Sequence, residues 1–196
     1  QFPKSPYVAD ATTGIQYCLL AQGKDEEPVK VLDEIVRENP SSPVGEELQL
    51  KKGDLLFSQK KYSEAADVYR GFAEKYPKSK FLANAQYALA KCYRLQGSPD
   101  EAALAFERAA NTPNATEKVI GESLFEAAEI YHIQRKSDKA ILTLQNLQER
   151  VKDPGIIAEA KVRAGEILRS LGKRAEANVQ FEEVIKEYND LPIADE

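Results

Sequence analysis

Residues that can cap the N-terminus of a helix recur every 37 positions along the whole chain. They are Ser5, Ser42, Ser79, Thr116, Asp153 and Asp190. Side chains of this kind accept hydrogen bonds from the first N–H groups of a helix, which have no partner inside it. A fixed step of this length is typical of proteins built from stacked repeats. Such proteins mostly provide binding surfaces, so the step constrains function as well as fold.

A second set of positions keeps the same step and orders small and bulky residues. Small residues occur at Gly53, Ala90, Ala128 and Gly165, with Gln16 in the first repeat. Twelve positions later stand Ala65, Ala102, Ala140 and Ala177, with Pro28 in the first repeat. Four positions further stand Leu32, Tyr69, Phe106, Leu144 and Phe181. This order predicts pairs of closely packed helices in which a bulky side chain fills the space beside the small ones.

The third repeat shows the expected pair of helices best. Apolar residues at helical spacing predict a first helix over about 81–96, and Gly97 ends it in a left-handed cap. The Ser-Pro-Asp-Glu segment at 98–101 favours the start of a second helix, because serine caps and proline suits the first turn. We therefore predict an all-α fold, a right-handed α-solenoid of about five helix-turn-helix repeats.

We expect a single solenoid domain over residues 1–196, because no Gly/Ser-rich linker interrupts the repeats. The predicted repeats cover approximately residues 7–41, 42–78, 79–115, 116–152 and 153–190. Residues 191–196 could begin a further helix, since Asp190-Leu191-Pro192 resembles the Asp153-Pro154 start of the fifth repeat. The absence of methionine indicates a processed form or a piece of a longer chain.

The composition suits an amphipathic helical protein and argues against two classes of partner. Hydrophobic residues make up 42% of the chain and charged residues 30%. The net charge of −5 argues against nucleic acid, because a phosphate backbone requires a basic surface. No apolar stretch approaches the roughly 18 residues of a membrane span, so we expect no direct membrane insertion.

The two cysteines occupy apolar positions of the repeat. Cys18 and Cys92 share the register of Leu55, Ile130 and Ile167. They lie two repeats apart, or roughly 20 Å at one helix-packing distance per repeat, whereas a disulfide requires Cα atoms within about 7 Å. We predict two buried free thiols and no disulfide.

The spacing of particular residues resembles the tetratricopeptide repeat (TPR) family. The residues that carry the resemblance are Gly53, Ala65, Tyr69 and Pro77, followed by Tyr93, Gly97, Ala102 and Phe106. The repeats are about three residues longer than the usual 34 of the family. The family's tryptophan is absent, and Gln49 and Gln86 stand in its place. The resemblance covers nearly all of residues 7–190 and implies a scaffold for protein–protein interaction.

A narrower resemblance concerns the location of the protein. Tyr76-Pro77-Lys78-Ser79, followed by Ala85, Tyr87 and Leu89, resembles the longer TPR repeats of bacterial envelope proteins. These include outer-membrane assembly lipoproteins and the periplasmic partner of the Tol–Pal system. The resemblance implies a periplasmic or envelope-associated location, with the cytoplasm as the alternative.

No pattern in the sequence points to catalysis, a cofactor or a metal. The single histidine, His132, cannot build a multi-histidine metal site, and neither cysteine has a partner at metal-ligand spacing. No glycine-rich phosphate loop occurs. We therefore expect a protein that is not an enzyme and needs no cofactor.

The resemblance implies that the first helix of each repeat lines a concave groove. In repeat three this face carries Tyr87, Lys91 and Arg94, at i, i+4 and i+7. The equivalent residues of repeats two, four and five are Leu50, Asp54 and Phe57; Phe125, Glu129 and His132; and Val162, Glu166 and Arg169. The predicted contacts for a protein or peptide partner are Tyr87, Lys91, Arg94, Phe125, Glu129, His132 and Arg169. Lys91 and Glu129 would set the register of the partner.

Several alternatives stay open. Glu129 could form an ordinary ion pair with a residue such as Arg163, and the aromatic residues could pack between repeats. The chain could also self-associate through apolar residues near Leu191 and Ile193, or be the regulatory part of a larger enzyme. A chaperone-type carboxylate clamp is not expected, because acidic residues stand where it needs lysine and asparagine.

Overall fold

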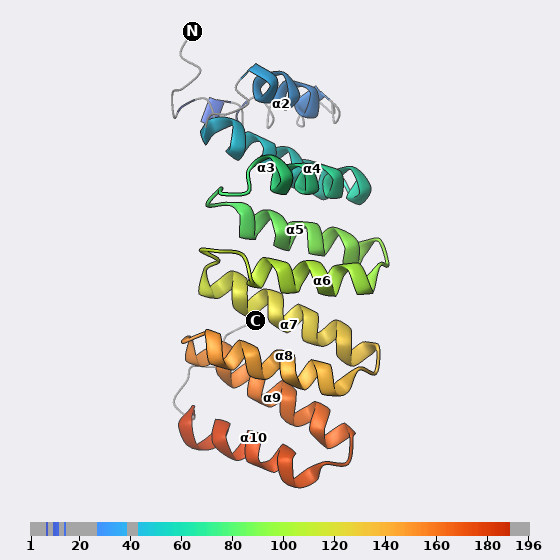
Figure 1. Ribbon diagram of the computed structural model, residues 1–196, viewed down its shortest axis with the longest axis vertical. Helices are drawn as coiled ribbons and strands as arrows, with labels where there is room; N and C mark the ends of the chain where they lie inside the picture. The colour runs from blue at the N-terminus through green and yellow to red at the C-terminus, as the bar shows by residue number, and fades with distance from the viewer. Residues whose placement is uncertain (1–6, 8–9, 12–13, 15–26, 39–42, 189–196) are drawn as a thin grey trace. The chain divides into compact units, whose positions relative to one another are not determined.

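The computed structural model describes residues 7, 10–11, 14, 27–38 and 43–188, and over these the chain forms helices and no strands. The predicted all-α helical-repeat fold is confirmed (Figure 1). The chain divides into two compact units, Gln1–Ser98 and Pro99–Glu196, and each is described by itself.

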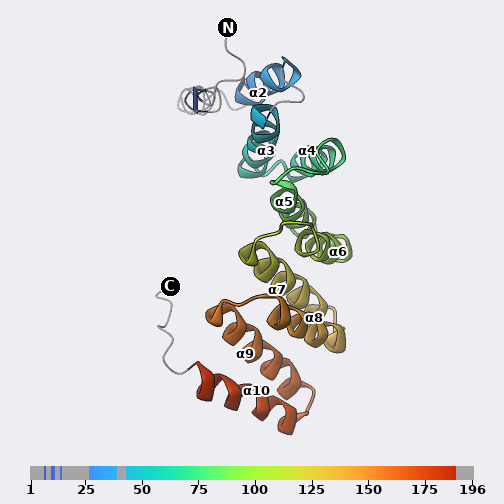
Figure 2. The same cartoon turned by 60° about the vertical axis from the view of Figure 1, so that its left-hand side comes forward.

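In the first unit, each helix packs against the next along the chain (Figure 2). The helices are α2 (Glu27–Glu38), α3 (Pro43–Ser58), α4 (Tyr62–Lys75) and α5 (Leu82–Leu95). In addition, α3 contacts α5 directly, so the first helices of two successive repeats lie side by side. The core between the helices contains fully buried Leu48, Tyr69 and Phe72.

In the second unit, residues 99–188 repeat this arrangement with five helices. They are α6 (Pro99–Ala110), α7 (Glu117–Ile133), α8 (Ser137–Arg150), α9 (Pro154–Ser170) and α10 (Arg174–Glu187). Neighbouring helices pack together, and α7 also contacts α9 directly. The pairs α3–α4, α5–α6, α7–α8 and α9–α10 fall within the predicted repeats two to five. The prediction of one solenoid domain remains a prediction, and residues 191–196 lie outside the described residues.

The predicted order of small and bulky residues corresponds to real contacts between paired helices. A Cβ atom added to Gly53 of α3 would lie 2.5 Å from the ring of Tyr69 of α4. A Cβ atom on Gly165 of α9 would lie 2.7 Å from the ring of Phe181 of α10. The second small position, from Pro28 to Ala177, is buried in all five repeats. The α3–α4 and α9–α10 pairs therefore close by placing a ring against the backbone of a glycine in the partner helix.

Two of the predicted caps are confirmed, and a third is displaced. Thr116 accepts a hydrogen bond from the N–H of Val119, and Asp153 accepts from the N–H groups of Gly155 and Ile156. Ser79 lies ahead of α5, which begins at Leu82; its hydroxyl accepts from the N–H of Phe81 and donates to Glu46 of α3. Ser79 therefore stabilises the loop before the helix. Ser5, Ser42 and Asp190 lie outside the described residues.

In repeats two to five, the turn between the two helices contains a left-handed residue. Positive φ angles occur at Lys60, Gly97, Arg135 and Gly172, which share one register position. At each turn two backbone hydrogen bonds return to the preceding helix, for example from Lys136 to Tyr131 and from Arg135 to His132. This pair of bonds defines a Schellman motif, whose left-handed residue is usually glycine. The sequence predicted a left-handed cap at Gly97, and Gly172 is a glycine at the same register position, but nothing in the residue type indicated the motif at Lys60 and Arg135.

We predict that Arg135→Gly stabilises the protein by about 1 kcal/mol, because a left-handed conformation is strained for any residue with a Cβ atom. Gly97→Ala is the matched opposite change: no atom lies within 4 Å of the added Cβ, so only backbone strain changes. It should destabilise by a similar amount. Urea unfolding followed by circular dichroism measures both, and equal shifts in the same direction would contradict the explanation.

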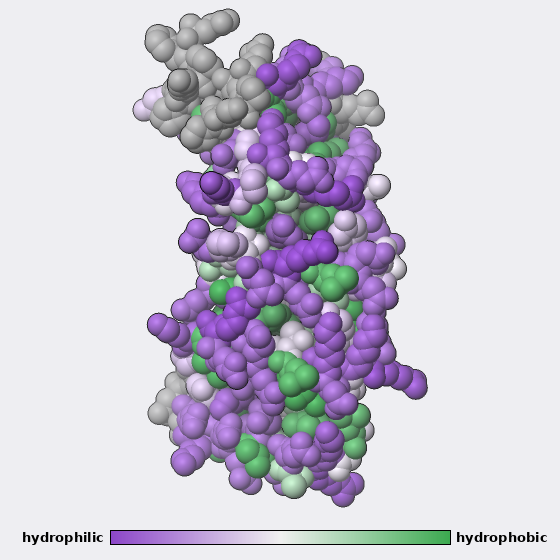
Figure 3. Space-filling view, viewed as in Figure 1, coloured by the Kyte–Doolittle hydropathy of each residue, from purple (hydrophilic) through white to green (hydrophobic). Residues whose placement is uncertain are grey.

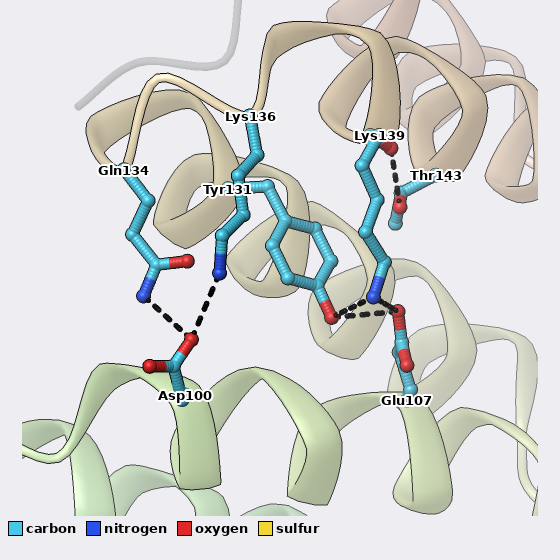
Figure 4. A network of polar contacts seen from close by, with 7 residues as sticks. All are labelled: Asp100, Glu107, Tyr131, Gln134, Lys136, Lys139 and Thr143. Atoms are coloured by element: carbon cyan, nitrogen blue, oxygen red, sulfur yellow. Dashed lines mark hydrogen bonds and ion pairs between the residues drawn. The ribbon is translucent and has the colours of Figure 1, made fainter.

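A network of polar contacts joins three helices of the second unit (Figure 4). Tyr131 of α7 donates a hydrogen bond to Glu107 of α6 at 2.8 Å and accepts one from Lys139 of α8 at 2.7 Å. The Lys139 ammonium also pairs with Glu107 at 3.3 Å. Closer to the turn, Asp100 accepts hydrogen bonds from Gln134 and Lys136. The network fixes α7 against the helices on either side of it.

Cys92 is free and fully buried in α5, as predicted, whereas Cys18 lies outside the described residues. Burial raises the pKa of the Cys92 thiol to about 11. We predict that a Cys18→Ser variant reacts with iodoacetamide about a hundredfold more slowly when folded than in urea, because only about one buried thiol in a thousand is ionised at pH 8. Mass spectrometry of the alkylated protein measures both rates, and equal rates would contradict the burial of Cys92.

Candidate functional site

A pocket of about 350 Å³ opens in the first unit where α3 and α5 lie side by side. It is lined by Leu50, Asp54, Phe57, Tyr69, Phe81, Asn84, Tyr87, Ala88 and Lys91. Seven of these nine residues come from α3 and α5, the first helices of repeats two and three, and they are half-buried or exposed. The pocket therefore lies where the resemblance implied a binding surface.

The ammonium of Lys91 in this pocket lies near two aromatic rings. The Lys91 ammonium lies 5.4 Å from the centroid of the Phe57 ring and 5.6 Å from that of the Tyr87 ring. Both distances are within the range of cation–π attraction. Within residues 43–98 Lys91 forms no ion pair, so its charge is held by aromatic faces and stays available to a partner.

The carboxylate of Asp54 in this pocket is oriented by the hydroxyl of the buried Tyr69 side chain. Tyr69 of α4 donates a hydrogen bond from its hydroxyl to Asp54 Oδ1 at 2.6 Å. Burial raises the pKa of the Tyr69 hydroxyl far above its usual value, so this group remains a donor. The Asp54 side chain is exposed, and no cation within residues 43–98 pairs with it. One carboxylate oxygen is thereby fixed while the other remains available.

The structure brings together part of the predicted set. Tyr87 and Lys91 line the pocket, together with the repeat-two equivalents Leu50, Asp54 and Phe57. Arg94 is exposed near the end of α5 and is not one of the lining residues. The remaining predicted contacts, Phe125, Glu129, His132 and Arg169, belong to the second unit.

In the second unit, the corresponding face between α7 and α9 is occupied by an arginine. Arg163 Nη2 donates to Glu129 Oε2 at 2.6 Å, and its Nε donates to the other carboxylate oxygen. Arg163 Nη1 donates to Glu166 at 2.8 Å. These bonds, led by those to Glu129, hold the pKa of Arg163 above its usual value. Glu129 is therefore in the ion pair that the sequence left open as an alternative.

The other three predicted residues of this unit lie in different environments. Phe125 and His132 of α7 are half-buried, and Arg169 near the end of α9 is exposed. The Nδ1 atom of His132 is buried, and among the described residues it has no hydrogen-bond partner. Arg94, His132 and Arg169 belong to different units, and their role as partner contacts remains a prediction.

Sequence reasoning missed four of the lining residues: Tyr69, Phe81, Asn84 and Ala88. Tyr69 was assigned to the core because its ring packs on Gly53, yet its hydroxyl reaches Asp54. Ala88 carries no signal alone, because alanine is common on any helix. A comparison of register would have found it, since Ala88 and Arg163 are equivalent positions of repeats three and five.

Two classes of site are not seen in the part of the chain that the structure describes. No group of three or more His, Cys, Asp or Glu side chains is placed to hold a metal ion there. Among the same residues, no helix combines the length and the apolar character that crossing a bilayer requires.

Two family models, both described as Tetratricopeptide repeat, match the chain. One matches residues 47–79 and 159–190, and the other matches residues 82–116. Together these segments make up just over half of the 196 residues. The chain therefore belongs to the tetratricopeptide repeat family, whose members are in general non-catalytic scaffolds suited to protein–protein interaction.

Solved structures of other proteins share this fold at low identity. MamA from Desulfovibrio magneticus RS-1 is 16% identical, with a TM-score of 0.64 over 97% of this chain and 99% of that one. BtubC (BKLC) from P. vanneervenii is 10% identical, with a TM-score of 0.64 over 96% and 92%. YrrB, described as a TPR protein with an unusual peptide-binding site, is 17% identical, with a TM-score of 0.59 over 92% and 86%. No curated protein matches the sequence.

Proposed function

We propose that the chain is a non-enzymatic scaffold that binds a segment of another protein in the pocket between α3 and α5. The observation that carries this proposal is the combination, in one pocket, of aromatic faces with a carboxylate and an ammonium that lack ion-pair partners within residues 43–98. Aromatic anchors and oriented charges are the features that dominate the binding energy of protein interfaces.

The size of the pocket supports a peptide segment. Its volume of about 350 Å³ is at the lower end for ligand sites and suits a few side chains of a partner. The similar fold of YrrB, described as having a peptide-binding site, agrees with this use of the scaffold. We also propose a role in a bacterial envelope complex, which rests on the resemblance of residues 76–89 to repeats of envelope proteins.

The experiment is affinity capture with cross-linking from bacterial envelope and cytoplasmic extracts. The native chain is compared with a Tyr87→Ala/Lys91→Glu variant and with a control, Ile185→Ala/Lys118→Glu, which also truncates an apolar side chain and reverses a lysine charge, at exposed positions of the second unit. A partner captured by the native chain and the control but lost by the pocket variant supports the proposal. Equal capture by all three chains would place the interaction elsewhere, and capture only from cytoplasmic extract would contradict the envelope location.

Arg94, Phe125, His132 and Arg169 remain proposed contacts for the same partner. An Arg94→Ala/His132→Ala/Arg169→Ala variant in the same capture assay tests the three cationic positions together. Unchanged capture by this variant, in a chain that is folded by circular dichroism, would remove them from the binding site.

A second candidate function is self-association, because the second unit exposes aliphatic side chains at one repeated position. Leu104 of α6, Leu142 of α8 and Val179 of α10 share a register and are each about half exposed or more. Figure 3 shows apolar areas over α6 and α8 among polar surroundings. Light scattering over a range of concentrations tests self-association. A molar mass equal to that of the monomer at every concentration would contradict it.

A further inference from the structure

The two units provide an internal comparison, because the same positions form the contact between neighbouring first helices in each. A shift of 75 residues relates α3 to α7 and α5 to α9. It places Asp54 on Glu129 and Ala88 on Arg163. Both units thus have an acid on the earlier helix, and they differ in the residue that faces it from the later one.

In the second unit the facing residue satisfies the acid from within the chain. The guanidinium of Arg163 makes two hydrogen bonds to the two carboxylate oxygens of Glu129. This two-point geometry is the preferred way for an arginine to pair with a carboxylate. The side chains of Arg163 and Glu129 are only 28% and 26% exposed, so the guanidinium occupies the space between the helices.

In the first unit the acid is kept and the arginine is absent. Ala88 lies at the Arg163 position, and the pocket of about 350 Å³ lies beside it with Asp54 in its wall. Two further replacements add aromatic faces, since Phe57 stands at the position of His132 and Tyr87 at that of Val162. Planar guanidinium groups stack on such faces as well as pairing with carboxylates.

We infer that this pocket binds the guanidinium of an arginine side chain supplied by a partner protein, in the place that Arg163 occupies in the second unit. Asp54 accepts the hydrogen bonds, and the rings of Phe57 and Tyr87 cover the face of the guanidinium. This inference rests on the proposed function and specifies the chemistry of its partner.

Lys91 adds a second requirement to the partner. It stands at the position of Glu166, the other acid that Arg163 contacts in the second unit, so the local charge is reversed there. A partner with an arginine alone would face the Lys91 ammonium without compensation. The fitting segment therefore carries an acidic residue close to its arginine, and this acid pairs with Lys91.

The test is a selection of displayed random peptides on the full-length chain, with counter-selection on an Ala88→Arg variant. That variant supplies the missing guanidinium from α5 and fills the pocket. Peptides that bind the native chain and not Ala88→Arg should be enriched in arginine followed or preceded by an acidic residue. Replacing that arginine by citrulline, which has the same shape without the charge, should weaken binding at least about tenfold.

Asp54→Asn is the variant that tests the acid without disturbing the packing, because its amide oxygen still accepts the Tyr69 hydrogen bond. It should weaken binding of the selected peptides at least about tenfold, and Lys118→Glu should not change it. Pocket-dependent peptides that lack arginine, or that bind Asp54→Asn as well as the native chain, would overturn the arginine assignment and leave the binding pocket in place. If no peptide distinguishes the native chain from Ala88→Arg, both the inference and the proposed pocket are wrong.

Discussion

Gly53→Ala is expected to destabilise the protein by about 1–3 kcal/mol, although alanine is the better helix former by about 1 kcal/mol. The added Cβ would lie 2.5 Å from the Tyr69 ring, closer than any real contact of this kind. The ring cannot move freely, because Tyr69 is buried and its hydroxyl is bonded to Asp54. The cost of separating α3 from α4 therefore exceeds the gain in helix propensity.

Gly71→Ala is the matched control for this prediction. Gly71 lies in the interior of α4, and a Cβ atom added to it would have no atom within 4 Å. Here only the propensity term acts, so the change should stabilise by about 0.5–1 kcal/mol. Urea unfolding of the two variants should give free energies that change in opposite directions. A stabilised Gly53→Ala would show that the glycine is not needed for the close approach of the helices.

The features that could be predicted from the sequence are those in which one residue type has one physical role. Gly53 and Gly165 mark positions where only a backbone fits beside a ring, and the periodic order of sizes located Tyr69 and Phe181 as their partners. Thr116 and Asp153 were recognised as caps because their side chains serve the same purpose in most helices. Repetition made each of these signals stronger, since the same role recurs at a fixed step.

Features that depend on a neighbour's side chain could not be predicted in the same way. Lys60 and Arg135 take up a left-handed conformation because the two helices around them must turn there, and tertiary packing outweighs their preference. Ala88 matters because its small side chain leaves the pocket open. An alanine at a single sequence position does not indicate such a space. Arg163 was foreseen only as a type of ion-pair partner, whereas the structure shows that it bonds to both Glu129 and Glu166.

The candidate site was therefore predicted by face and only partly by residue. The first-helix positions of repeats two and three do line a pocket, because the periodicity fixes which side of α3 and α5 packs on α4 and which side is left open. Whether an open side forms a pocket or is closed by an ion pair depends on two residues, Ala88 and Arg163. The sequence pattern assigns Ala88 and Arg163 alike to a helix surface. Only a comparison of the repeats distinguishes an open pocket from one closed by an ion pair.

Arg163→Ala is expected to destabilise the protein by about 2 kcal/mol, because it leaves two partly buried carboxylates without their cation. Full burial would make the loss larger, but about a quarter of the side-chain surface of Arg163 and Glu129 is exposed, and solvent screens the pair. Lys118→Ala is the control: this side chain is 80% exposed and pairs loosely with Glu122, so its removal should have no measurable effect.

Double-mutant cycles separate the two bonds of Arg163. The coupling of Arg163 with Glu129 of α7 should be about 1–2 kcal/mol, since it joins two helices with two hydrogen bonds. The coupling with Glu166, three residues away on the same helix and more exposed, should be below about 0.5 kcal/mol. Urea unfolding of the single and double alanine variants gives both values. A larger coupling with Glu166 than with Glu129 would mean that Arg163 acts mainly within α9. The space that a guanidinium fills between α7 and α9 could then no longer serve as the template for an arginine between α3 and α5.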